Sequence, residues 1–167
     1  MGQQQLLLLV LGIVLVGLAV VVGISAFGEN KAKTNLDLMT SDAVRLATAV
    51  QAWKMKPRAS GGGQSDANFD RATFAQLGIQ PQSGSGRDAT YETPSGRFRI
   101  KTFVVSGAVA VLAQQQYGIS NTGNAVAVVG LSRDGTQSVM IAIFASNPDR
   151  AVTILQHPYN TEVYNAP

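Results

Sequence analysis

The apolar residues of this chain are concentrated at its beginning. Leu6 to Phe27 is an unbroken run of 22 apolar or small residues, and the first charged side chain is Glu29. About 20 helical residues, at 1.5 Å of rise each, cross the roughly 30 Å hydrocarbon core of a membrane. Sixteen residues of the run are Leu, Val, Ile or Phe, which favours insertion by about 5 to 10 kcal/mol. The run therefore predicts a helix that enters a membrane at some stage.

A second pattern of apolar residues begins after this run. Its members are spaced three or four residues apart, which places them on one face of a helix. Pro57 then ends the helix. This stretch is short for a coiled coil, so we expect its apolar face to pack against a sheet of the same chain. The seam between helix and sheet is predicted at Leu36, Met39, Ala43, Leu46, Val50 and Trp53.

Residues 57–96 are rich in Gly, Ser and Pro and predict a long loop. Inside this loop, Asn68 to Leu77 carries apolar residues at helical intervals and is followed by Gly78. The spacing predicts a short helix that stops at the glycine.

The period of the apolar residues changes to two after Gly96, which predicts strands. Arg133-Asp134-Gly135 predicts a hairpin turn and Asn147-Pro148-Asp149 a further turn. An antiparallel sheet with one face half-buried needs a cover, and the helical seam is the cover that the sequence offers. The expected strands are 97–105, 108–113 (after a turn at 106–107), 124–131, 137–145 and 151–156.

The predicted fold is therefore α+β, with a long N-terminal helix packed on an antiparallel sheet of four or five strands. We expect four segments. These are an apolar helical segment at 1–28, the amphipathic half of the same helix at 29–56, the loop at 57–96 and the sheet at 97–167.

Composition narrows the chemistry. The chain has no cysteine and one histidine, so thiolate metal sites, disulfides and cysteine nucleophiles are excluded and a zinc site has no second imidazole. No pair of nucleophile and base is evident, and we expect no catalytic residues, no metal and no cofactor. Charged residues are only 14% and the net charge is +3, which suits a subunit largely covered by copies of itself and argues little for nucleic acid.

One row of cations is a candidate contact surface. Arg97, Arg99 and Lys101 alternate along the first long predicted strand and therefore share one face. With Tyr91 and Phe103 nearby, they could bind an anionic polymer such as DNA or a surface polysaccharide. The alternative, which we favour, is a solvated strand face or a row of partners for acidic side chains of another subunit.

The charges around the apolar run point to processing at its beginning. No Lys or Arg precedes Lys31, whereas a secretory signal peptide needs a basic first region. Lys31 and Lys33 lie on the C-terminal side, and alone they would place the sheet in the cytoplasm. A short basic leader removed before Met1 resolves this conflict, so we interpret Met1 as the mature N-terminus.

The chain begins with the uncharged head MGQQQLLLLVLGIVLVGLAVVVGISAFG, which is followed by the seam, a long loop and a sheet. This order of segments resembles the type IV pilin family with its pseudopilin and archaeal-type relatives. In that family a leader is removed, the new N-terminus is methylated, and the apolar half-helices bundle in a filament core. The resemblance implies processing and methylation at Met1, with prepilin peptidase and the pilus assembly machinery as partners. It also implies a homopolymeric extracellular filament, with the cytoplasmic membrane holding the precursor. The implied core residues are Gln5, Leu6, Leu9, Ile13, Val16, Val20, Ile24 and Phe27.

The chain departs from the bacterial pattern at one position. Bacterial members usually carry glutamate as the fifth mature residue, and the residue here is Gln5; cleavage after Gly2 would instead make Leu7 the fifth. An amide can accept a hydrogen bond from an ammonium without neutralising it, which favours the archaeal-like manner of packing. The leading hypothesis is a major pilin for adhesion, motility or surface attachment. The alternatives are a pseudopilin or minor pilin of a secretion or DNA-uptake system, and a membrane-anchored binding domain that does not polymerise.

Overall fold

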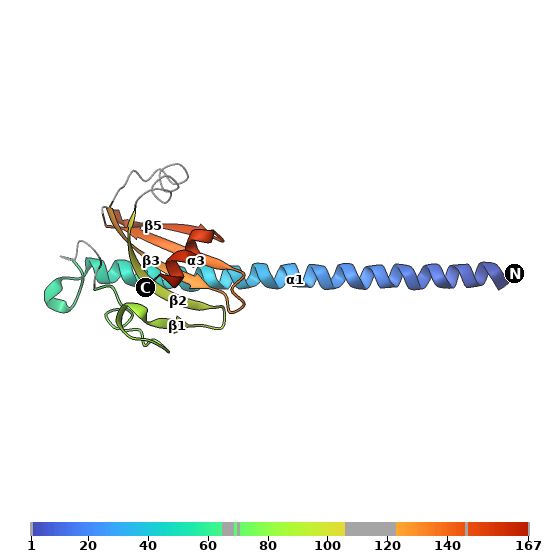
Figure 1. The fold of residues 1–167 in the computed structure, drawn as a ribbon, viewed down its shortest axis with the longest axis horizontal. Coiled ribbons are helices and arrows are strands. Elements are labelled where there is room, and N and C mark those ends of the chain that lie inside the picture. Colours follow the sequence, from blue (N-terminus) through green and yellow to red (C-terminus); the bar gives the residue numbers. More distant parts are fainter. Residues whose placement is uncertain (1, 65–68, 70, 106–122, 146, 167) are drawn as a thin grey trace. The chain divides into compact units, whose positions relative to one another are not determined.

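The computed structural model describes residues 2–64, 69, 71–105, 123–145 and 147–166. The chain divides into two units, residues 1–35 and residues 36–167. Together they give an α+β protein in which a long N-terminal helix packs, through its second half, on a five-stranded antiparallel sheet (Figure 1).

The first element, α1, runs from Gly2 to Met55 and has 54 residues. It ends two residues before Pro57, which lacks the N–H group needed to continue the helix. In the second unit, the face of α1 that carries Met39, Ala43 and Val50 is fully buried. Packing against the sheet, more than helix propensity, therefore stabilises this half of α1.

The loop after α1 differs from the prediction in two ways. It contains short 3₁₀ helices, η1 (Arg58–Ser60) and η2 (Gly86–Asp88), and a three-residue strand, β1 (Thr90–Glu92), that the sequence did not predict. The helix predicted over 68–77 is wrong for its described residues, which form turns; Asn68 and Asp70 lie outside them.

The aromatic residues of this loop explain the error. Phe69 has a φ of +56°, outside the helical region, and it is fully buried. A single turn follows, in which Leu77 N–H donates to the Thr73 carbonyl and Ile79 N–H donates to the Phe74 carbonyl. Gly78, with a φ of +73°, closes this turn as expected for a stop signal. The periodic apolar residues therefore reflect burial of Phe69 and Phe74 in the core instead of a helix.

The sheet is an antiparallel meander in the order β1-β2-β3-β4-β5 (Figure 1). Its long strands are β2 (Arg97–Val105), β3 (Gly123–Leu131), β4 (Ser138–Phe144) and β5 (Asn147–Leu155). The turn at 106–107 and the strand predicted at 108–113 lie outside the described residues.

The predicted turn at 147–149 is wrong, because β5 already begins at Asn147. Proline is tolerated in an edge strand, where its missing N–H breaks no ladder bond. In β5 the proline is Pro148, and its carbonyl accepts a hydrogen bond from Gln51 Nε2 of α1 at 2.9 Å.

Side chains alternate between the two faces of the sheet. One face packs on α1 and includes Phe98, Val128 and Ile141. The other face carries Val129 and Met140. These residues pack under α3 (Pro158–Asn165), a helix that the sequence analysis did not predict. Both faces of the sheet are therefore covered, although the sequence predicted a cover for one.

Candidate functional site

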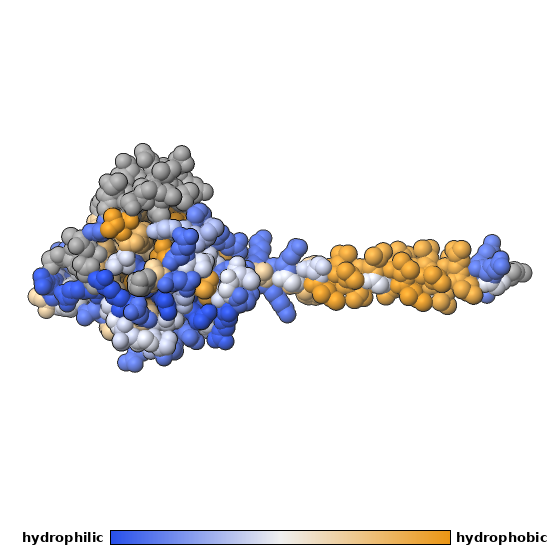
Figure 2. All heavy atoms as spheres, in the orientation of Figure 1, coloured by the Kyte–Doolittle hydropathy of each residue, from blue (hydrophilic) through white to orange (hydrophobic). Residues whose placement is uncertain are grey.

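The most exposed apolar surface of the described chain is the first part of α1. Its large side chains from Leu6 to Phe27 are between 50% and 72% exposed. Figure 2 shows them as a continuous hydrophobic surface on this segment. Among the described residues, α1 is the one helix long and apolar enough to cross a membrane.

The residues predicted for a filament core lie in this surface. Met1 lies outside the described residues, and Gln5 is exposed at the beginning of the helix. The others are spaced three or four residues apart and therefore share one side of α1. The large apolar side chains on the other sides of this segment are exposed to a similar extent, so exposure does not single out that side. The residues predicted on that side are Leu6, Leu9, Ile13, Val16, Val20, Ile24 and Phe27.

The predicted seam lies between the second half of α1 and the sheet. Five of its residues are at most 4% exposed, and Leu36 is half-buried. The buried five are Met39, Ala43, Leu46, Val50 and Trp53. The indole Nε1 of Trp53 donates to the Gly61 carbonyl at 3.2 Å.

The seam also contains a lysine that the pattern of apolar residues could not reveal. Lys54 is 9% exposed, and its ammonium lies 4.8 Å from the centre of the Phe69 ring. A cation over an aromatic face keeps a favourable electrostatic contact when it is buried. Lys54 is therefore part of the core.

In the structure, two of the three cations of the candidate polyanion surface contact α3 and the residue that follows it. Lys101 is 6% exposed, and its Nζ donates to the Ala166 carbonyl and lies 3.4 Å from Asp88 Oδ1. Arg99 donates to the Tyr164 carbonyl at 3.1 Å, and its guanidinium lies 4.8 Å from the centre of the Tyr164 ring. Arg97 is half-buried. Two of the three cations thus serve the carbonyl end of α3, where positive charge is favourable.

The beginning of α3 is capped by the histidine of the chain. His157 Nδ1 accepts a hydrogen bond from the backbone N–H of Tyr159 at 3.1 Å. Pro158 occupies the first helical turn, a position where its missing N–H has no cost. His157 is therefore a structural cap.

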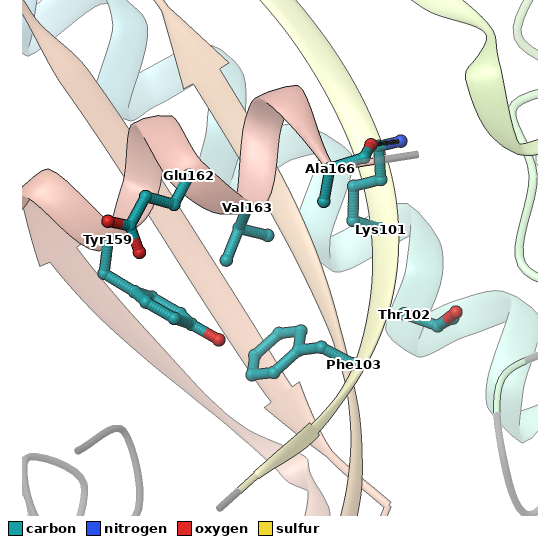
Figure 3. A pocket seen from close by; sticks show the side chains of 7 residues that line it. All are labelled: Lys101, Thr102, Phe103, Tyr159, Glu162, Val163 and Ala166. Carbon is teal, nitrogen blue, oxygen red and sulfur yellow. Dashed lines mark hydrogen bonds between the residues drawn. The ribbon is translucent and has the colours of Figure 1, made fainter. Parts of the chain in front are cut away.

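A small pocket of about 240 Å³ lies between β2 and α3 (Figure 3). The Phe103 and Tyr159 rings line it in an edge-to-face arrangement, with their centres 6.2 Å apart. Burial, and then the negative charge of Glu162, raise the pKa of Tyr159 above its ordinary value. Lys101, on the pocket's other side, already donates to Ala166. The lining contains no histidine or serine, and no group of metal-ligating side chains occurs among the described residues.

Comparisons with family models, with curated proteins and with solved structures found no match. The architecture itself is pilin-like, because a long apolar N-terminal helix continues into a half that packs on an antiparallel sheet. The exposed apolar part of α1 indicates membrane association or secretion.

Proposed function

We propose that this protein is the major structural subunit of an extracellular type IV pilus-like filament. It polymerises through the apolar part of α1 and serves adhesion, motility or surface attachment. The observation that carries the proposal is the exposure of every large apolar side chain from Leu6 to Phe27 in the single chain. Soluble monomers rarely expose a contiguous apolar surface of this extent. Lipid covers it before assembly, and the helices of other copies cover it afterwards.

The glycines of α1 support a polymer over a simple anchor. At 100° per residue, Gly12 and Gly23 lie within about 20° of each other around the helix, as do Gly17 and Gly28. The two pairs are about 140° apart, and a Cβ added at any of these glycines would meet no atom of this chain. Glycines allow helices in an apolar medium to approach closely. Two separate faces for close approach let one copy pack against two others, which is the requirement for an open polymer.

The sheet unit then forms the outer coat of the proposed filament. The precursor is held in the cytoplasmic membrane by its apolar helix, and a prepilin peptidase processes it at Met1. An assembly machinery then adds the processed chain to the filament. In this arrangement the second half of α1 and the helix α3 stay packed on the sheet. Only the first part of α1 changes its surroundings, from lipid to the helices of other copies.

The first experiment is an intact-mass and N-terminal analysis of material sheared mechanically from cells. The proposal expects the chain in the sheared polymer fraction, beginning at Met1 or Gln3 and carrying an added methyl group. A chain found only in the membrane fraction would indicate an anchored binding domain. A chain beginning after Phe27 would indicate a secreted domain. Low abundance with short filaments would instead indicate a pseudopilin or minor pilin.

A further inference from the structure

We propose that the side-chain amides of Gln3, Gln4 and Gln5 form hydrogen bonds between neighbouring copies of this chain and set the axial register of their helices. This inference rests on the proposed function, because it concerns copies that lie side by side in a filament.

The polar side chains of the head fall into two classes. Before Glu29 they are the three glutamines and Ser25. Ser25 Oγ donates to the Val21 carbonyl at 3.1 Å, so its hydroxyl is satisfied within its own helix. Gln3, Gln4 and Gln5 are exposed, and their side-chain amides form no hydrogen bond with any described residue.

Burial of the head has different consequences for the two classes. An amide that leaves water without a partner is strongly penalised, whereas the bonded hydroxyl of Ser25 is not. A carboxamide has both donors and an acceptor, so amides of identical copies complement one another. The partner that this chemistry fits is therefore a second copy of the same chain, presenting its own glutamines.

The position of the glutamines gives them a role in register. Three consecutive helical residues, 100° apart, fan out over about 200° of the helix surface and can reach neighbours on more than one side. The large apolar side chains of the 22-residue run after them offer non-directional contacts, which resist sliding of one helix along another less than a hydrogen bond does. Directional bonds at one end limit the axial offset between copies to what two glutamine side chains can span. A polar residue in an apolar seam fixes register in coiled coils by the same principle.

The test compares two variants of the full chain in sheared filaments by electron microscopy. The first replaces all three glutamines (Gln3→Leu, Gln4→Leu and Gln5→Leu), and the matched control, Ser25→Ala, removes a polar group that is already satisfied. We expect the control to keep the wild-type filament yield and a single axial rise. The triple variant should lose the single axial rise, or form at least roughly tenfold fewer filaments while its chain remains in the membrane.

Wild-type yield and axial rise in the triple variant would overturn the inference. If the triple variant does not accumulate, the three single variants replace it, and each should lower filament yield by roughly fivefold, the effect of one lost hydrogen bond. Unchanged yield and rise in all three would then overturn it. Absence of filaments from wild-type cells would overturn the proposed function itself, which separates the two failures.

Discussion

At the scale of single residues, close packing between β2 and β3 depends on a glycine. A Cβ added at Gly130 would lie 2.5 Å from Cε1 of Phe98 and 2.9 Å from Cγ1 of Val139. Both side chains belong to the buried core, and neither is more than 1% exposed. The ring of Phe98 therefore occupies the space that a side chain would need, which no single-sequence pattern reveals.

We expect Gly130→Ala to lower the free energy of unfolding by about 1 to 3 kcal/mol, because overpacking forces the Phe98 ring out of its position. Thermal or denaturant unfolding in detergent measures the change. Gly28→Ala is the matched control, since a Cβ there meets nothing within 4 Å. Equal stability of the two alanine variants would contradict the close packing of Phe98 against Gly130.

The ionisation of Tyr159 is also decided by its surroundings. Burial and Glu162 both raise its pKa above the ordinary value of 10.0. A raised phenol pKa means that folding favours the neutral form. Its contribution to stability is therefore present below the ordinary pKa and is lost as pH rises through the raised value.

We expect Glu162→Gln to lower the pKa of Tyr159 without fully restoring it, because the effect of burial remains. Ultraviolet titration, read as the difference between each protein and its Tyr159→Phe version, isolates this tyrosine. An unchanged pKa in the glutamine variant would show that Glu162 does not act on the phenol.

At the scale of elements, α3 is held at both ends by polar contacts. His157 caps its first turn, and Arg99 and Lys101 bond to carbonyls near its last turn. A helix of eight residues is unstable alone in water. Its apolar contacts with the sheet, through Val163 and Tyr164, and these polar contacts together keep it in place.

We expect Lys101→Met to weaken the docking of α3 by about 1.5 to 3 kcal/mol, since it removes the charged hydrogen bond that the buried Lys101 donates to the Ala166 carbonyl. Hydrogen exchange of the amides in α3 measures this, and they should exchange faster than in wild type. Lys33→Met, at an exposed position of α1, is the control and should leave them unchanged. Equal protection of α3 in both variants would contradict the role of Lys101.

At the scale of the whole molecule, the residues that form the folded core and the residues proposed to drive association lie in different parts of the chain. The cores of the sheet unit lie within residues 36–167, and the apolar residues from Leu6 to Phe27 contribute to none of them. Changes in the apolar run should therefore affect association with lipid or other copies and leave the sheet unit folded.

We expect Val16→Asp, and likewise Leu9→Asp, to abolish filaments while the unfolding temperature of the sheet unit stays at its wild-type value. An aspartate near the centre of an apolar helix costs roughly 2.5 to 3.5 kcal/mol in each subunit. Shearing yield and thermal unfolding measure the two effects. Gln76→Asp, at an exposed position of the second unit, is the control that should still assemble. Normal filaments from Val16→Asp would contradict assembly through α1.

Residues with a strict period or an extreme composition were predictable. The run from Leu6 to Phe27 leaves few structures available to it, since a helix satisfies every backbone group without water. The seam and β2 could be predicted because their apolar residues recur on one face of each element, which imposes the periods 3.6 and 2 on their sequences. The error over 68–77 has the reverse cause, because Phe69 and Phe74 are buried by an irregular turn that happens to repeat helical spacing.

The sequence by itself determined the α+β class, the long apolar helix and the antiparallel strands, because these follow from local periodicity and composition. Only the tertiary structure decided that β1 and α3 exist, that Lys54 is buried and that Arg99 and Lys101 hold α3. The buried position of Lys54 and the bond of Lys101 to α3 depend on partners distant in the chain, Phe69 and Ala166. Contacts of this kind leave no periodic trace in the sequence, since burial of a charged side chain is favourable only once its partner is in place.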